Sequence, residues 1–364
     1  MKTSLKLKLA CFAGGLLIAA CAGKGDKTDV VRTTVGFKLN APLGLDTGSA
    51  TFFVPDDNPL TEEKVRLGKR LYFDKGLSAD GSISCASCHV PEKGFADPNR
   101  FSAGVRGQKG TRQAPTIVNR VFSRAQFWDG RAASLEEQVI TPITNPAEMG
   151  HTKMKLVLRR LQADPSYVEA FREAFAGERA ITEQHLAQAI ASFERTILSG
   201  NSPYDRYVNG DKTAMSESAV RGYGLFLGKA KCASCHVSFN FTDEIYHNLG
   251  TGSLGKNPDQ GRFAISKLDG HQGAFKTPTL REVANTAPYM SDGSLQTLEE
   301  VIEYYDKGCR PNQWLSPKIK ALDLSAQEKA DLVEFLKALS GEVTWYGKEE
   351  ELKRTKPLAI ASGS

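Results

Sequence analysis

Two groups of residues have the types and spacing needed to attach a haem covalently. They read Cys85-Ala86-Ser87-Cys88-His89 and Cys232-Ala233-Ser234-Cys235-His236. In a C-x-x-C-H motif the two thiols add to the vinyl groups of a haem, and the imidazole that follows binds the iron. The sequence therefore predicts two covalent haems c, with His89 and His236 as proximal iron ligands.

Other uses of paired cysteines fit this pattern less well. A zinc site made of two C-x-x-C pairs usually keeps them roughly 15–20 residues apart, whereas these pairs lie in different halves of the chain. A thioredoxin-like redox pair would hardly occur twice with the same trailing histidine. Cysteines in even number within an oxidising compartment normally suggest disulfides, but the histidine after each pair favours haem.

The first twenty residues have the features of an export signal. Lys2, Lys6 and Lys8 precede a short apolar run that ends Ile18-Ala19-Ala20-Cys21, an ending that resembles the lipobox of bacterial lipoproteins. We expect Cys21 to become a lipidated N-terminus, with ordinary cleavage close by as the alternative. Either outcome predicts a periplasmic protein, and the first predicts a membrane contact through the N-terminal lipid only.

Composition and charge exclude some classes of partner. The chain is 40% hydrophobic and 24% charged, as soluble globular proteins are. It carries 47 basic and 42 acidic residues, and without the three signal lysines its net charge is +2. This charge is too small to predict nucleic-acid binding or attraction to an acidic membrane surface. No stretch after the first twenty residues is long and apolar enough to span a membrane.

Apolar periodicity predicts a mainly α-helical protein. Residues 325–339 begin with a capping box, Ser325-x-x-Glu328. Residues 186–197 and 152–175 each have the pattern of a further helix, and residues 219–226 predict the helix that leads into the second haem motif. The expected fold is two cytochrome c-like haem domains packed together with long irregular loops.

Ordered matches through nearly the whole mature chain resemble the bacterial diheme cytochrome c peroxidases and their relative MauG. These are Leu67-Gly68, Phe73-Asp74, Leu77-Ser78, Gly81, Arg112, Pro115-Thr116, Phe127 to Arg131, Asn145 to Met149, Phe275 to Arg281 and Ala287 to Tyr289. The resemblance implies an enzyme, a peroxidase with hydrogen peroxide as its electron acceptor. Together with the signal and the polar composition that follows it, the resemblance divides the chain into a lipoprotein signal at 1–20, a tether at 21–48, an N-terminal peroxidatic haem domain at 49–205, a C-terminal electron-transfer haem domain at 206–340, and a tail at 341–364 that we expect to pack back on the first domain.

For the first haem, the resemblance places Gln138, Pro142 and Glu148 in the distal pocket. It implies that Glu148 is the acid/base group that moves a proton between the peroxide oxygens. Gln138 would donate a hydrogen bond to the charge that develops. Many peroxidases of the family cap this iron with a histidine, but the aligned segment here is 102–105, which ends in Val105. Valine cannot bind iron, so we expect a haem open to peroxide, as in MauG; His151 is a rival ligand close by in sequence.

For the second haem, alignment places Tyr305 where peroxidases of the family have a methionine ligand. Leu298, Val301 and Ile302 share a helical face with Tyr305, so a plain core aromatic is the alternative. A tyrosine ligand resembles MauG and favours oxidised iron. Met290 is the second candidate for this ligand.

The resemblance implies two features between the haems. Trp128 would be the relay through which they exchange an electron. A calcium ion is held in the family by an Asn side chain and backbone oxygens; the aligned position here is Gln113, with Lys276 and Pro278 as carbonyl donors. Because Gln is longer than Asn, this calcium site is the weaker of the two predictions.

The expected function is peroxide activation at the first haem, with oxidising equivalents shared with the second. The electrons would come from a small redox protein or from a residue of a protein substrate, as in MauG. An ordinary cytochrome c peroxidase that detoxifies peroxide is the alternative within the family. A diheme electron carrier without catalysis is the alternative outside it.

Overall fold

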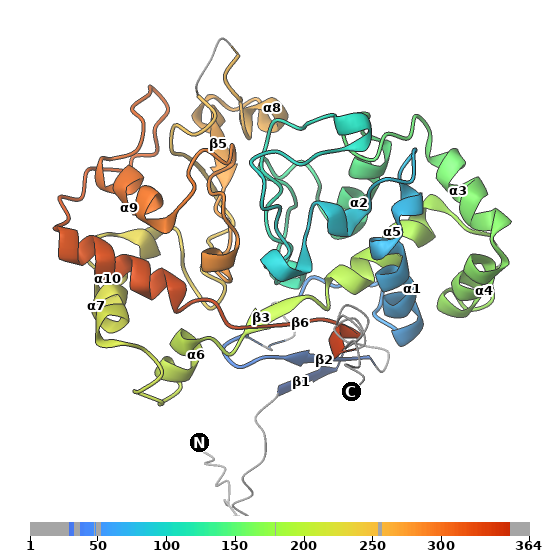
Figure 1. The fold of residues 1–364 in the computed structure, drawn as a ribbon, viewed down its shortest axis with the longest axis horizontal. Helices are drawn as coiled ribbons and strands as arrows, with labels where there is room; N and C mark the ends of the chain where they lie inside the picture. The colour runs from blue at the N-terminus through green and yellow to red at the C-terminus, as the bar shows by residue number, and fades with distance from the viewer. Residues whose placement is uncertain are drawn as a thin grey trace, which may run out of the picture.

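Two mainly helical halves lie side by side in the computed structural model of the chain (Figure 1). The structure describes residues 29–32, 37–46, 48, 52–178, 180–253 and 257–349. The predicted signal at 1–20 and the predicted lipid site at Cys21 lie outside these residues. Within the described ranges, no helix combines the length and the apolar character needed to cross a membrane. The prediction of a mainly α fold is confirmed.

Each half has its own apolar core. The helices of the first half are α1 (Glu62–Phe73), α2 (Leu135–Thr144), α3 (Met154–Ala163), α4 (Pro165–Ala174) and α5 (Glu183–Glu194). Those of the second half are α6 (Pro203–Val208), α7 (Glu217–Leu227), α8 (Phe263–Ser266), α9 (Leu298–Asp306) and α10 (Ala326–Lys337). Buried side chains of α1 to α5 fill one core, and those of α7, α9 and α10 fill another.

Short elements connect these helices. The 3-10 turns are η2 (Lys75–Leu77), η3 (Cys85–Ser87), η4 (Pro91–Lys93), η5 (Val105–Gly107), η6 (Arg120–Phe122), η7 (Cys232–Ser234), η8 (Asp269–His271) and η9 (Val283–Asn285). The strands form three antiparallel pairs: β1 (Asp29–Arg32) with β2 (Lys38–Ala41), β3 (Leu198–Gly200) with β6 (Glu342–Thr344), and β4 (Tyr246–Asn248) with β5 (Ala274–Lys276). Long irregular segments fill the space between, as expected.

The two halves repeat one helix crossing. In the first half α1 packs on α5, and a Cβ built on Gly68 would lie 1.9 Å from the carbonyl oxygen of Ala189. In the second half α7 packs on α10, and a Cβ on Gly222 would lie 1.9 Å from the carbonyl oxygen of Asp331. Only glycine allows helices to approach this closely. The shared crossing indicates that one structural unit occurs twice.

The final strand joins the halves. β6 pairs with β3 at their junction, with Leu198 opposite Thr344 (Figure 1). Beyond it, the Trp345 ring packs edge-on against Phe95 at a centroid distance of 5.1 Å. The Lys69 ammonium also donates to the carbonyl oxygen of Gly347 at 2.9 Å. Residues 342–349 therefore lie against the first half.

Two segments differ from what the sequence predicts. The segment 21–48 reads as a tether, yet Leu39 and Ala41 are each only 2% exposed, because alternate residues of β2 face the core. A single helix over 152–175 is wrong, since the chain breaks at Asp164-Pro165. The Asp164 side chain accepts from the amide of Ser166 and begins α4 instead. The capping box at Ser325 is confirmed.

A buried ion pair ties three distant segments together. Arg281 and Asp205 have side chains that are 0% and 1% exposed, with Nη1 and Oδ2 2.5 Å apart. The guanidinium also donates to the carbonyl oxygens of Phe239 and Gly44. Since Gly44 precedes α1 and Phe239 follows η7, this one side chain anchors the N-terminal segment to the second half.

Candidate haem sites

The first haem motif folds as a tight turn. Cys85 begins η3, and its carbonyl oxygen accepts from the amides of Cys88 and His89 at 3.2 and 2.9 Å. The Nδ1 of His89 lies 3.1 Å from the carbonyl oxygen of Pro115 and 3.3 Å from that of Phe95. These contacts leave Nε2 for a metal, since the partner of one ring nitrogen fixes which nitrogen can coordinate. Two thiols and one oriented imidazole fit covalent haem c.

The second haem motif repeats this geometry. The carbonyl oxygen of Cys232 accepts from the amides of Cys235 and His236 at 3.2 and 2.9 Å. The Nδ1 of His236 lies 2.9 Å from the carbonyl oxygen of Phe241. Both proximal histidines are therefore oriented in the same way. We call the two cysteines and the histidine of each motif a haem site: the first haem site is Cys85, Cys88 and His89, and the second haem site is Cys232, Cys235 and His236.

A Pro-Thr pair braces each proximal loop, and both pairs lie within the segments that resemble the family. The Thr116 hydroxyl donates to the carbonyl oxygen of Gly94 at 2.5 Å, just before Phe95. The Thr279 hydroxyl donates to the carbonyl oxygen of Asn240 at 2.7 Å, just before Phe241. Pro115-Thr116 and Pro278-Thr279 are thus equivalent positions of the two halves.

The predicted distal residues of the first haem site, which we call the distal wall, come from α2 and the turn that follows it. Gln138 and Pro142 are four residues apart on α2, so they lie on one helical face. The chain then turns back, and the amide of Met149 donates to the carbonyl oxygen of Pro142 at 3.1 Å. This turn brings Glu148 next to Pro142. The Oε1 of Glu148 accepts from the Asn145 side chain at 2.8 Å.

Glu148 is held in an environment suited to proton transfer. Burial raises the pKa of its carboxyl above the ordinary value, and Arg131 and Asn145 offset part of that shift. The carboxylate also lies near the first haem turn: burial, and then the charges of Asp97 and Glu148, raise the pKa of the Cys88 thiol, which the Ser102 side chain opposes. Glu148 and the Cys88 thiol therefore lie close enough to interact electrostatically.

The loop at 102–108 closes against Glu148. The amide of Val105 donates to the carbonyl oxygen of Glu148 at 2.8 Å, and Val105 is 3% exposed. A Cβ on Gly104 would lie 2.0 Å from the carbonyl oxygen of Ala147. The segment that would carry a capping histidine thus presents valine beside the distal wall. His151 follows Glu148, and its buried Nε2 makes no hydrogen bond with the described residues.

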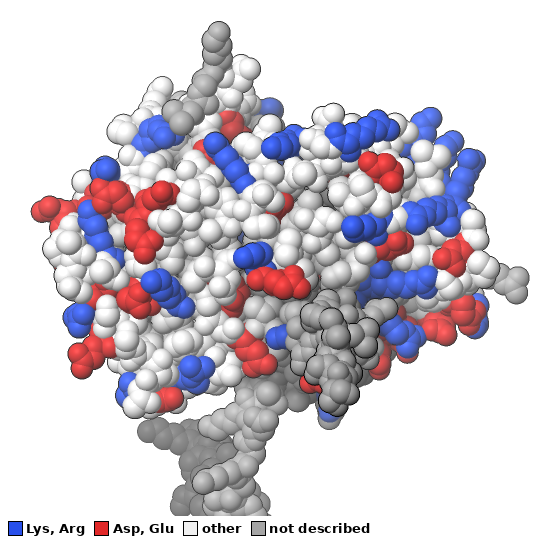
Figure 2. Space-filling view, viewed as in Figure 1, with Lys and Arg blue, Asp and Glu red and all other residues white. Residues whose placement is uncertain are grey.

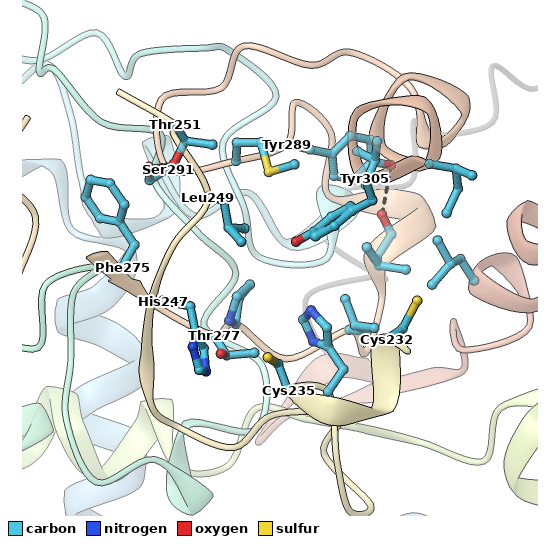
Figure 3. Close-up of a pocket in the computed structure, with 18 of the residues that line it drawn as sticks. Cys232, Cys235, His247, Leu249, Thr251, Phe275, Thr277, Tyr289, Ser291 and Tyr305 are labelled. Atoms are coloured by element: carbon cyan, nitrogen blue, oxygen red, sulfur yellow. Dashed lines mark hydrogen bonds between the residues drawn. The ribbon is translucent and has the colours of Figure 1, made fainter. Parts of the chain in front are cut away.

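A cavity lies above the second haem motif (Figure 3). Cys232 and Cys235 lie along one wall, and Tyr305 of α9 extends its hydroxyl into the cavity from the opposite wall. Met290, the second candidate, also lines this cavity. Burial raises the pKa of the Tyr305 phenol well above its ordinary value, and a bound cation is what stabilises a phenolate in such a place.

Trp128 lies where the two sites approach each other. Its indole nitrogen donates to the carbonyl oxygen of Gln113 at 2.8 Å, and its own carbonyl oxygen accepts from the amide of Lys276 at 2.7 Å. Trp128 lines the second cavity, as does Pro115, whose carbonyl oxygen contacts His89. The segment 113–116 therefore touches both haem sites.

The predicted calcium donors lie together but fit calcium poorly. Gln113, Lys276 and Pro278 all line the second cavity. The Gln113 side chain already donates to the carbonyl oxygen of Asp97 at 3.2 Å. Lys276 brings a buried ammonium that pairs with Glu244 at 2.7 Å. Calcium favours several oxygens including carboxylates, so this geometry adds no support to the calcium prediction.

One group at the second haem site has no counterpart in the sequence predictions. His247 Nε2 lies 2.9 Å from Asp243 Oδ2, and ligand atoms of both lie within 4.8 Å of the Cys235 sulfur. Such a trio could bind a metal ion. Haem attachment uses the Cys235 sulfur, so only two of the three donors would remain. Cys235 belongs to the second haem motif and Asp243 lies four residues before His247, but only the fold shows that the three side chains meet.

Comparisons with known proteins point to one family. A model of the di-haem cytochrome c peroxidases matches residues 62–213. The methylamine utilization protein MauG of Methylorubrum extorquens is 44% identical over 288 residues, covering 79% of this chain and 81% of that protein. Cytochrome c551 peroxidase of Pseudomonas aeruginosa is 36% identical over 290 residues, covering 78% and 80%.

A solved structure shares the fold. A MauG-like protein associated with microbial copper homeostasis superimposes with a TM-score of 0.75 and 36% identity, covering 82% of this chain and 95% of that one. Long matches of this identity, with both haem motifs in the same fold, show the family. The chain belongs to the diheme cytochrome c peroxidase and MauG family.

Proposed function

We propose a division of roles within this diheme peroxidase, in which peroxide reacts at the first haem site and a partner is oxidised through the second. When bound, the haems would supply the iron that reacts with peroxide and holds the two oxidising equivalents taken from it. Reduction of one hydrogen peroxide to two waters consumes two electrons and two protons. The buried carboxylate of Glu148 beside the first haem turn is the observation that carries this proposal.

Glu148 is placed to move a proton between the two peroxide oxygens. Asn145 holds its Oε1, so Oε2 is the atom that accepts a proton from one oxygen and returns it to the other, which leaves as water. Gln138 and Pro142 form the rest of the wall. Gln138 can donate to an oxygen on which charge develops, and Pro142 excludes water without competing for the proton.

The test of this proposal mixes the resting holoprotein with one equivalent of hydrogen peroxide and follows the absorption spectrum. Since Val105 occupies the capping segment, we expect a response without prior reduction. A response only after one-electron reduction would indicate a reductively activated peroxidase. No response in either state would indicate that the protein is a diheme electron carrier without peroxidase activity.

Two functions are open within the family: oxidation of a protein substrate, as in MauG, and detoxification of peroxide. We rank the MauG-like oxidase slightly above the detoxifying peroxidase. Tyr305 and Val105 are the residues that favour it. Relatives named MauG are 44% and 41% identical to this chain, and those named cytochrome c peroxidase are 34–38% identical. Export to the periplasm and a lipid on Cys21 belong to the same proposal.

Tyr305 is the proposed second ligand at the second haem site. Tyr305→Phe is expected to shift one low-spin signal in the electron paramagnetic resonance spectrum of the resting protein, since the phenol oxygen is lost. Tyr304→Phe is the matched control, because the Tyr304 hydroxyl donates to the carbonyl oxygen of Leu249 instead. An unchanged spectrum in Tyr305→Phe would transfer the role to Met290.

Trp128 is the proposed relay. Its indole can lose and regain an electron, and it lies between a segment that contacts His89 and the second cavity. In Trp128→Phe we expect the first haem to react with peroxide while the spectral response of the second is lost. Trp314→Phe, at a position 37% exposed, is the control. A full response of both haems in Trp128→Phe would exclude the relay.

A further inference from the structure

The cavity at the second haem site has an unbalanced charge. Among the described residues that line it, four are lysines and none is Asp or Glu: Lys231, Lys276, Lys318 and Lys320. Lys276 is buried and paired with Glu244. The other three are exposed, and we call Lys231, Lys318 and Lys320 the lysine collar.

The lysine collar lies at the edge where the haem is attached. Lys231 immediately precedes Cys232. The Lys318 ammonium donates to the carbonyl oxygen of Ser234 at 2.7 Å and lies 3.9 Å from the Cys235 sulfur. A haem c at this site would be attached through thioether bonds from Cys232 and Cys235 to its vinyl groups. Lys231 and Lys318 would therefore lie beside the attachment edge of the haem.

Few acidic groups neutralise the collar. In residues 227–247 and 314–324, Asp243 and Glu244 are half-buried and paired with His247 and Lys276. Asp323 is the one exposed carboxylate of these two segments. Lys318 lies 3.9 Å from Asp243, and the structure gives no ion pair within its described ranges to Lys231 or Lys320. The surface at this edge thus carries a net positive charge.

Exposed apolar side chains accompany the collar. Val237 follows His236 and is 38% exposed, Ile245 is 54% exposed, and Trp314 is 37% exposed. They belong to the same two segments as the lysines. An apolar centre with a charged rim is the usual anatomy of a transient protein interface, and charges on the rim steer a partner of opposite sign.

A rival surface lies over α9 and α10, where acidic side chains gather in Figure 2. The groove between these helices contains Glu299, Glu300, Glu303 and Glu334. It also contains Lys307, Lys329 and Lys337, and these pair with Glu303 and Glu334 at 2.6–2.9 Å. Because the groove is largely neutralised from within, it offers a weaker field to a basic partner.

From these contacts we infer that the electron-donating partner is an acidic redox protein that docks on the lysine collar, with its redox centre against the apolar side chains at the second haem edge. This inference rests on the proposed function, which leaves the electron donor unspecified, and it names the class of that donor. Each docking event passes one electron from the partner, so two events complete the reduction of one peroxide.

The test uses one probe in two charge states. A basic, lysine-rich small cytochrome c is compared with the same protein after succinylation, which turns its lysines into carboxylates. We expect the holoprotein to oxidise the succinylated form faster in the presence of peroxide. That rate should fall on the order of tenfold between about 20 and about 200 mM salt, since screening weakens steering.

Charge reversal locates the surface. Lys231→Glu/Lys318→Glu/Lys320→Glu should slow oxidation of the succinylated probe on the order of tenfold and speed that of the unmodified probe. The matched control is Lys153→Glu/Lys155→Glu/Arg159→Glu, an equal charge change at exposed positions in and beside α3. Haem content and the absorption spectrum check that each variant is loaded.

Each outcome decides one question. Preference for the basic probe, or equal effects of the two triple variants, would overturn the docking surface. Titration of the oxidised succinylated probe against the resting holoprotein measures docking without turnover. If it binds in a collar-dependent way but peroxide gives no reaction, the surface stands and the proposed function fails.

Discussion

Replacement of Glu148 with Gln is expected to slow the reaction of the holoprotein with hydrogen peroxide by roughly 10²–10⁴-fold, the usual contribution of a positioned acid/base group. Glutamine has the same shape and can still accept from Asn145, so the wall should stay intact. What is lost is an atom that can accept and return a proton. Stopped-flow absorbance of the resting protein after mixing with peroxide measures the rate.

The pH profile separates this role from a structural one. Burial raises the pKa of Glu148 above its ordinary value, and the ionised form is the one that accepts the proton. The rate should therefore be constant at higher pH and fall as pH drops through that raised pKa. Glu148→Gln should have no such acidic limb. Glu92→Gln, an exposed carboxylate beside the first haem turn, should keep both the rate and the limb; loss of the limb there would count against Glu148.

Replacement of Asp205 with Ala is expected to lower the free energy of unfolding by about 3–5 kcal/mol, as when one partner of a buried ion pair is removed. The Arg281 guanidinium would keep its carbonyl contacts to Phe239 and Gly44 but would hold an uncompensated charge in a site with no solvent. Chemical denaturation of the holoprotein, followed by the haem spectrum and by circular dichroism, measures the loss.

Two further variants identify the cause of that loss. Asp56→Ala, at an exposed position, should change stability by less than about 0.5 kcal/mol. The double variant Asp205→Ala/Arg281→Met removes both charges and should recover much of the stability, because no buried charge is left alone. A double variant no more stable than Asp205→Ala would mean that the contacts of Arg281 to Phe239 and Gly44 matter more than the charge.

Local patterns predict the helices and the attachment of the haems. C-x-x-C-H places two thiols and an imidazole within one turn, so the sequence alone defines both proximal sites. The capping box at Ser325 fixes the start of α10 because cap and first turn are neighbours in sequence. The break at Asp164-Pro165 was readable by the same logic, since proline favours the first turn of a helix, but the apolar pattern continues across it.

Contacts between distant segments could not be read in this way. The lysine collar joins residue 231 to residues 318 and 320, and Lys318 reaches the carbonyl oxygen of Ser234 across 84 residues. The core position of Leu39 depends on a surface that later residues supply. The distal wall with Glu148 was reachable only through resemblance, because alone it reads as an ordinary carboxylate near a turn.

The pairing of β6 with β3 brings a late segment of the chain against residues that surround the first haem site. The loop of Phe95, which orients His89, is covered by Trp345, and Lys69 reaches Gly347 across 278 residues. Such contacts close a very long loop and form late, after local helix pairs have assembled. Synthesis from the N-terminus delivers the haem-binding turn at 85–89 early and its cover last. The first haem site therefore lacks part of its cover until residues 342–349 have packed against it.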